Sequence, residues 1–127
     1  SLVGFVVRVS RINAGESVGY NAKYIAVKPT YIATLSLGYA DGIARKSTGG
    51  EVIINGKKRK MVGNVCMDYC FAVVDEKTRR GDEVIFIGES GGERITAEDI
   101  AKKENTICYE VLTRLKRIKR KYVKSIL

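Results

Sequence analysis

The segment Glu51-Val52-Ile53-Ile54-Asn55-Gly56-Lys57-Lys58-Arg59-Lys60-Met61-Val62 predicts the fold class more clearly than any other part of the chain. An apolar, β-branched run precedes Asn55-Gly56, and a second strand-like run follows it. Asn-Gly favours a two-residue β-hairpin, because both central positions of a type I′ turn need positive φ angles, which asparagine and glycine tolerate. We therefore predict two antiparallel strands joined by this turn.

Further strand-like segments lie on both sides of this hairpin. They are rich in β-branched and apolar residues and are separated by turn residues, and they cover residues 2–9, 22–28, 30–37, 65–74 and 83–87. The turn Gly38-Tyr39-Ala40-Asp41-Gly42 has a composition that permits close approach of two backbones. Residues 88–92 are glycine-rich, and we expect a flexible connection there.

The C-terminal part of the chain has helical patterns. Thr96-Ala97-Glu98-Asp99 places an acid three residues after a capping threonine, which predicts a short helix from residue 97 to about 104. A second short helix around 109–115 and a closing strand at 122–126 are also compatible with the sequence. Many short strands separated by turns are typical of a sandwich or barrel. We expect a mainly β fold, a small closed Greek-key-like β-barrel with one or two short helices near the C-terminus.

Composition narrows the possible functions. The chain has 127 residues, of which 45% are hydrophobic, so one ordinary core and a single domain are expected. It contains 0 histidines, which excludes a histidine triad and a histidine metal site within it. Of the net charge of +9, seven basic residues lie between Arg114 and Lys124 with no acid among them, and 9 − 7 leaves +2 for the rest.

Cysteine content and hydropathy indicate the cellular compartment to expect. Cys66, Cys70 and Cys108 are odd in number and form no Cys-x-x-Cys pair, so neither a disulfide framework nor a four-cysteine zinc site is expected. We expect a reducing, cytoplasmic setting and small buried side chains such as Cys66. No apolar run is long enough to cross a bilayer, and the first residues read as a strand, as in an excised piece of a larger protein.

Several ordered motifs resemble one known family. They are Ala14-Gly15-Glu16-Ser17-Val18-Gly19-Tyr20, Leu37-Gly38-Tyr39-Ala40-Asp41-Gly42, Val62-Gly63-Asn64-Val65-Cys66-Met67-Asp68, Gly81-Asp82-Glu83-Val84, Ile87-Gly88, Ile95-Thr96-Ala97-Glu98 and Thr106-Ile107-Cys108-Tyr109-Glu110-Val111. In order and spacing they resemble the C-terminal domain of alanine racemases that depend on pyridoxal 5′-phosphate. The resemblance extends over essentially the whole of residues 1–127.

This resemblance implies an activity that the chain shares with other parts of a protein. Family members begin with a TIM-type barrel whose lysine binds pyridoxal 5′-phosphate, and that barrel is absent from this chain. Their active site forms where the barrel of one subunit meets the C-terminal domain of the other, so the homodimer is the catalytic unit. The reaction interconverts L- and D-alanine, and D-alanine enters bacterial peptidoglycan. We therefore expect the isolated chain to be inactive.

The resemblance assigns roles to three residues, each of which has a purely structural alternative. Tyr20 matches the catalytic tyrosine that exchanges a proton on one face of the substrate; alternatively, it is a half-buried packing residue. Met67 matches the residue whose backbone N–H holds the substrate carboxylate; alternatively, it is a core residue of the strand 65–74. Tyr109 matches the tyrosine that contacts the cofactor phosphate; alternatively, it is an apolar residue of a short helix.

The resemblance also predicts residues that line the substrate corridor. They are Tyr39, Arg45, Asn64 and Ile107. Asn64 stands where most members have arginine, so one cation of the corridor becomes a neutral amide. Lys119 stands where the family usually has proline, within the basic C-terminal segment.

Two other functions are compatible with the sequence. One is a serine or broad-specificity racemase on the same scaffold. The other is a small basic β-barrel that binds nucleic acid through residues 114–124, although that segment offers only Tyr122 for stacking on bases. We expect neither a nucleic-acid partner nor a metal, and no membrane association. The expected partners are the barrel domain, a second subunit and alanine.

Overall fold

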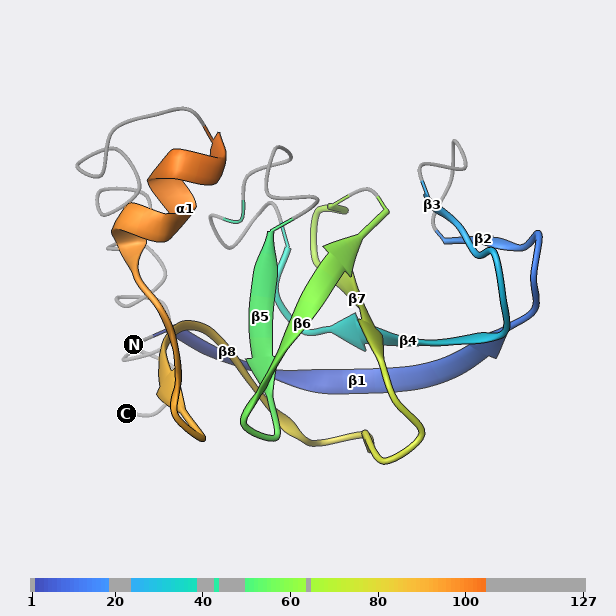
Figure 1. Cartoon of the computed structure of the whole chain (residues 1–127), viewed down its shortest axis with the longest axis horizontal. Helices are drawn as coiled ribbons and strands as arrows, with labels where there is room; N and C mark the ends of the chain where they lie inside the picture. The colour runs from blue at the N-terminus through green and yellow to red at the C-terminus, as the bar shows by residue number, and fades with distance from the viewer. Residues whose placement is uncertain (1, 19–23, 39–42, 44–49, 64, 105–127) are drawn as a thin grey trace.

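The computed structural model describes residues 2–18, 24–38, 43, 50–63 and 65–104 (Figure 1). Its elements in chain order are β1 (Leu2–Ile12), β2 (Ser17–Val18), β3 (Tyr24–Ile25), β4 (Thr30–Leu35), β5 (Glu51–Ile54), β6 (Lys57–Val62), β7 (Cys70–Val74), β8 (Glu83–Ser90), β9 (Glu93–Ile95) and α1 (Ala97–Glu104). The helix and strand expected at 109–115 and 122–126 lie outside the described residues.

The main sheet closes on itself. Its strands pair in the order β1-β4-β7-β6-β5-β8-β9, and β1 pairs again with β8. Closure is possible because β1 is long: Leu2 to Phe5 pair with β8, and the strand then pairs with β4 from Val6 to Ile12. All these pairs are antiparallel. The predicted small closed β-barrel is therefore confirmed, with β9 added at the edge of β8.

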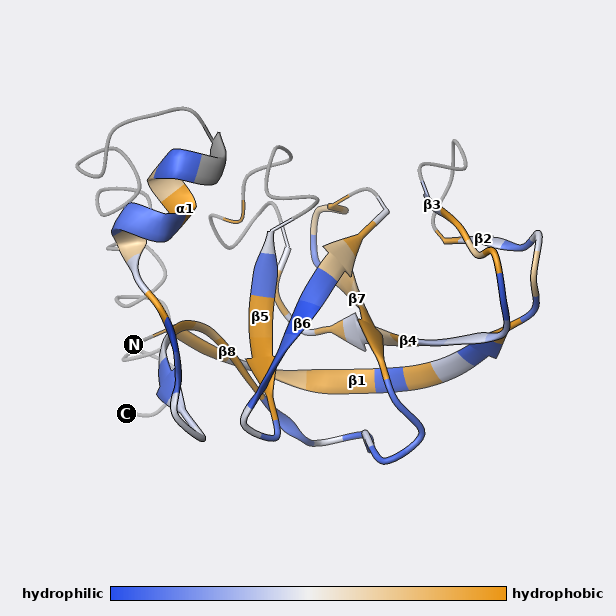
Figure 2. Cartoon of the chain, viewed as in Figure 1, coloured by the Kyte–Doolittle hydropathy of each residue, from blue (hydrophilic) through white to orange (hydrophobic). Residues whose placement is uncertain are grey.

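The barrel is filled by side chains from every strand that closes it. Leu35, Leu37, Val52 and Val84 are fully buried in this core. Ile53, between two inward-facing residues of β5, instead packs outside the barrel beneath β9 and α1. Figure 2 shows hydrophobic residues concentrated on β5 and β8 and mostly hydrophilic residues along α1.

Local predictions at the hairpin and at the helix are confirmed. Asn55 and Gly56 have φ angles of 54° and 75°, as a type I′ turn requires. At the start of α1 the Asp99 N–H donates to Thr96 Oγ1 over 3.1 Å, and the Thr96 N–H donates to Asp99 Oδ2 over 2.8 Å. These two bonds form a reciprocal cap, and the bonds from Thr96 lower the pKa of Asp99.

Three predicted segments differ from the structure. The strand expected at 65–74 begins only at Cys70, because residues 65–69 form a loop. The strand expected at 22–28 is reduced in the described residues to β3, which pairs with β2 instead of joining the barrel. Residues 88–92, expected to be a flexible connection, belong to the hairpin of β8 and β9, in which Gly91 and Gly92 supply positive φ angles of 59° and 84°.

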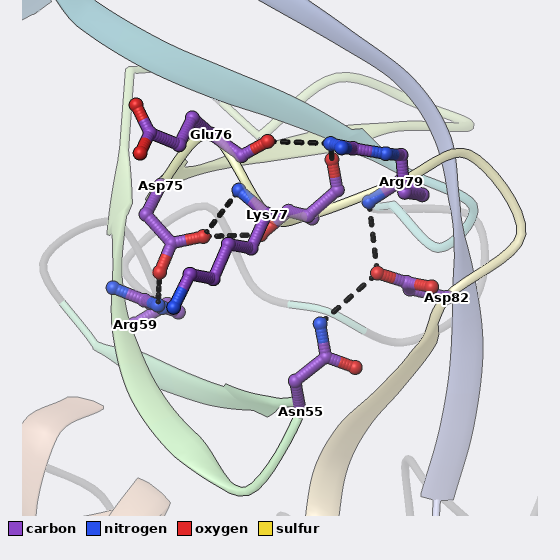
Figure 3. Close-up of polar contacts among 8 residues, drawn as sticks. Asn55, Arg59, Asp75, Glu76, Lys77, Arg79 and Asp82 are labelled. Atoms are coloured by element: carbon purple, nitrogen blue, oxygen red, sulfur yellow. Dashed lines mark hydrogen bonds and ion pairs between the residues drawn. The ribbon is translucent and has the colours of Figure 1, made fainter.

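Polar contacts anchor the connection between β7 and β8 (Figure 3). Asp75 accepts hydrogen bonds from the Lys77 N–H at 2.9 Å and from Arg59 Nη2 on β6 at 2.7 Å. The bond from the Lys77 backbone, followed by the contact with Arg59, lowers the pKa of Asp75. The Arg59–Asp75 hydrogen bond therefore links β6 to the first residue of the β7–β8 connection.

Asp82 closes the same connection at its other end. Its Oδ2 atom accepts from Asn55 Nδ2 at 3.0 Å and from the Arg79 N–H at 2.8 Å, and the Arg79 side chain also donates to the Glu76 carbonyl (Figure 3). The β5–β6 turn is thus tied to the β7–β8 connection. Both lie at one end of the barrel, and the β6–β7 connection lies at the other end (Figure 1).

α1 has eight residues, and no helix in the described ranges has the length and apolar composition needed to cross a membrane.

Candidate functional site

The loop between β6 and β7 contains the single predicted site residue that the structure describes, Met67. The other predicted site residues lie outside the described residues, and they are Tyr20, Tyr39, Arg45, Asn64, Ile107 and Tyr109. Tyr20, Tyr39 and Asn64 directly follow, or nearly follow, residues that the structure describes. Val18 lies two positions before Tyr20, Gly38 directly before Tyr39, and Gly63 directly before Asn64.

The Met67 loop, residues 65–69, is closed at its base by a backbone hydrogen bond. The Cys66 N–H donates to the Tyr69 carbonyl over 2.8 Å, which places Met67 and Asp68 at the tip. The Met67 side chain is 67% exposed, so the structural alternative of a core residue on a strand is wrong. Cys66 is half-buried, not buried as expected.

Gly38 packs directly against this loop. A β-carbon on Gly38 would lie 2.4 Å from the Cys66 carbonyl oxygen, 2.4 Å from the Tyr69 nitrogen and 2.7 Å from the Asp68 carbonyl carbon. Real β-carbons essentially never come this close to other heavy atoms. The close backbone approach expected of the turn that starts at Gly38 is therefore confirmed at this residue, and its partner is the Met67 loop.

The residue that follows β6 makes a second close approach, to the β2–β3 hairpin. A β-carbon on Gly63 would lie 3.2 Å from both Cγ1 and the carbonyl oxygen of Val18. Val18 also packs in a hydrophobic cluster with Ile32 and Val62, which fixes the hairpin to the outside of the barrel. The connection from Gly63 to Tyr69 thus contacts two segments that are distant in the sequence, one ending before Tyr20 and one ending before Tyr39.

The Met67 loop presents a backbone N–H at its tip. Its tip is exposed, and no hydrogen bond between described backbone groups uses the Met67 N–H. A backbone N–H binds a carboxylate through its position and not through the identity of the side chain. A loop fixed by backbone contacts can hold such a donor in place.

A metal ion or a covalently bound cofactor would need suitable ligands among the described residues. In the described ranges, no group of three or more His, Cys, Asp or Glu residues is arranged to hold a metal ion. Every lysine whose side chain is described is exposed, and these are Lys28, Lys57, Lys58, Lys60, Lys77 and Lys102.

The sequence predicted a close backbone approach for the turn that starts at Gly38, but it predicted none for Gly63. Glycine in a turn indicated that backbones could approach closely, but it did not indicate which backbone approaches. Gly38 and Tyr69 are separated by 31 positions, and Val18 and Gly63 by 45. Both pairs meet only because β4 pairs with β7 and because the hairpin folds back onto the barrel.

A family model described as "Alanine racemase, C-terminal domain" matches residues 1–122. The chain belongs to this family. The alanine racemase of Streptococcus gordonii is 45% identical over 112 residues, which cover 88% of this chain and 30% of that protein. The chain thus spans under a third of the length of this curated relative.

Solved structures share the fold of this alanine racemase C-terminal domain. The crystal structure of alanine racemase from E. faecalis matches with a TM-score of 0.86 and 37% identity, over 89% of this chain and 30% of that one. Alanine racemase from Bartonella henselae, whose structure has covalently bound pyridoxal phosphate, matches with a TM-score of 0.80 and 36% identity, over 89% of this chain and 32% of that one.

The basic segment 114–124, considered above for nucleic-acid binding, lies outside the described residues of the domain.

Proposed function

We propose that this chain is the C-terminal domain of an alanine racemase and completes an active site beside an N-terminal barrel domain. The observation that carries the proposal is the Met67 loop, which combines an exposed tip with a base fixed by the Cys66–Tyr69 hydrogen bond and by Gly38. Family membership and the relatives' threefold greater length support a second, larger domain as the partner. The unit of activity is a homodimer in this proposal.

In the proposed site, Met67 and Tyr20 act on different parts of the substrate. The Met67 N–H donates to the alanine carboxylate and so fixes the orientation of the α-carbon. Tyr20 removes or returns a proton on one face of that carbon. A phenol needs hydrogen bonds or cationic neighbours to do this near neutral pH, and those come from the other domain.

The cofactor belongs mainly to the other domain. When bound, pyridoxal 5′-phosphate supplies an electron sink that stabilises negative charge at the substrate α-carbon. Tyr109 donates a hydrogen bond to its phosphate, and Tyr39, Arg45, Asn64 and Ile107 line the path of the substrate. The product D-alanine serves peptidoglycan synthesis.

A chimeric enzyme tests this function. The chain replaces the corresponding C-terminal segment of the Streptococcus gordonii alanine racemase, and interconversion of L- and D-alanine is measured after loading with pyridoxal 5′-phosphate. We expect racemisation by the chimera and none by the isolated chain. A folded, cofactor-loaded chimera without activity, beside an active parent, would contradict the proposal. The same assay with serine tests the alternative substrate.

Two variants of the chimera test the role of the Met67 backbone. Met67→Pro removes the N–H, whereas Met67→Ala keeps it and removes only the exposed side chain. We expect Met67→Pro to weaken competitive inhibition by propionate, a carboxylate without an amino group. Met67→Ala serves as the control and keeps inhibition near that of the unchanged chimera. Equal propionate inhibition of both variants would show that the Met67 N–H does not bind the carboxylate.

A further inference from the structure

Gly38 contacts backbone atoms of the Met67 loop on both sides of its tip. The Cys66 oxygen and the Tyr69 nitrogen both lie 2.4 Å from the position that a β-carbon would occupy on Gly38. Gly4 offers a contrast, because the nearest atom to its added β-carbon is the side-chain Oγ of Ser36 at 2.8 Å. A side chain can rotate away from an added methyl group, whereas the backbone of a closed loop must move as a whole.

The barrel core holds Gly38 itself in place. Leu37 is fully buried, and the Ile43 N–H donates to the Gly38 carbonyl over 3.3 Å. Two residues before Leu37, Leu35 pairs with Cys70 in the ladder between β4 and β7. The side chains at the tip of the loop, in contrast, are exposed. The position of the tip therefore depends on backbone contacts at its base.

We infer that Gly38 is a positioning residue, which sets the direction of the Met67 N–H and thereby the placement of the substrate carboxylate. The inference rests on the proposed function, because it needs Met67 to be the carboxylate donor. It adds that binding of a small carboxylate depends on the absence of a β-carbon at Gly38, which follows β4, the strand paired with the β7 strand that the donor loop precedes. A Gly38→Ala substitution displaces the donor without removing any group that binds substrate.

The test uses the cofactor-loaded chimera and measures kcat, KM for alanine and the inhibition constant of propionate. For Gly38→Ala we expect KM and the inhibition constant to rise by about 10-fold to 100-fold, the loss expected for one hydrogen bond to a charged group, with a smaller change in kcat. Gly81→Ala is the matched control. Unlike Gly38, Gly81 has a positive φ, 91°, so alanine strains its backbone, but an added β-carbon meets no atom within 4 Å. We expect backbone strain in Gly81→Ala and unchanged propionate inhibition.

Asp68→Gly provides a second perturbation that does not depend on the Gly38→Ala protein folding. It loosens the loop tip from within, and Asp68 is exposed, so the barrel core is unaffected. We expect a smaller rise in KM and in the propionate inhibition constant than for Gly38→Ala, because loss of the Asp68 carboxylate also removes a negative charge that repels an anion. Unchanged constants in folded Gly38→Ala, or in Asp68→Gly, would overturn the inference while leaving the proposed function intact. A wild-type chimera that racemises no alanine would overturn the proposed function and the inference together.

Discussion

Gly63 and Val18 lie so close that a β-carbon on Gly63 would be 3.2 Å from the Val18 carbonyl oxygen. This contact joins the end of β6 to β2, the strand after which Tyr20 follows two positions later. The same connection continues into the Met67 loop and reaches Gly38. One short stretch of backbone therefore links the segments that carry the proposed proton-exchanging residue and the proposed carboxylate donor.

Tyr20→Phe in the cofactor-loaded chimera tests the proposed exchange of a proton on one face. The substitution removes only the hydroxyl group, so folding and cofactor absorbance should be preserved. We expect racemisation to fall by about 10² to 10⁴, the usual contribution of a positioned acid-base group. Solvent deuterium exchange into D-alanine, which depends on the cofactor lysine, should persist better than exchange into L-alanine.

Two results would contradict the directional role of Tyr20. Wild-type exchange in both directions would make the residue a packing residue. Equal, severe losses in both directions with intact cofactor absorbance would indicate that Tyr20 positions the substrate and does not exchange one specific proton.

Asn64→Arg tests the electrostatics of substrate entry. Asn64 follows Gly63 and stands where most relatives are expected to have arginine, so the proposed substrate corridor would carry one cation fewer. Adding that cation should increase the attraction of the anionic carboxylate, and salt screens such attraction. We expect Asn64→Arg in the chimera to change the salt dependence of kcat/KM more than kcat. Kinetics at several ionic strengths check this, and identical salt profiles would refute it.

Asn55→Asp should destabilise the end of the barrel that lies opposite the Met67 loop. Asn55 Nδ2 donates to Asp82 Oδ2 over 3.0 Å, and the substitution sets two carboxylates against each other. We expect a loss of about 1 kcal/mol in the free energy of unfolding. Denaturant unfolding of the purified chain measures this. Combining it with Asp82→Asn should recover part of the loss, and purely additive effects of the two substitutions would argue against direct coupling.

The lowered pKa values of Asp75 and Asp99 predict an acid-sensitive fold. A carboxyl group whose pKa is lower in the folded than in the unfolded chain contributes stability at pH values above the unfolded pKa. That contribution is lost as the pH falls from about the ordinary value of 3.8 through the lower folded value. Urea unfolding of the purified chain should therefore show decreasing stability below this pH.

The double variant Asp75→Asn, Asp99→Asn provides the control for this acid sensitivity. It should be less stable than the wild-type chain at neutral pH, because the charged acceptors of the Arg59, Lys77 and Thr96 bonds are lost. Its stability should also depend less on pH in the acid range. An unchanged pH dependence would show that other carboxyl groups cause the effect.

The parts of the fold that depend only on residues close together in the sequence could be predicted. Asn55-Gly56 supplies the φ angles of its turn by itself, and Thr96 and Asp99 cap α1 across three positions. The predicted bounds of α1 are therefore confirmed. The closed barrel could be expected from the number and spacing of strands, although the order of the strands could not.

The candidate site depended more on contacts between distant residues. The apolar run from Val65 to Val74 has the composition of one strand, yet residues 65–69 form a loop closed between Cys66 and Tyr69. Local β-propensity cannot distinguish these outcomes, because strand pairing and the backbone of Gly38 decide which residues join the ladder.

The sequence alone thus determined the β-rich class, the tight turn, the helix start and, through its ordered motifs, the family. The tertiary structure decided that Met67 is exposed, that Ile53 faces away from the barrel interior, and that Gly38 and Gly63 support one connection from two sides. The physical reason is the sequence separation over which each interaction acts. Turn dihedrals and helix caps are satisfied within a few residues, whereas a close backbone approach exists only after strands far apart in the chain have paired.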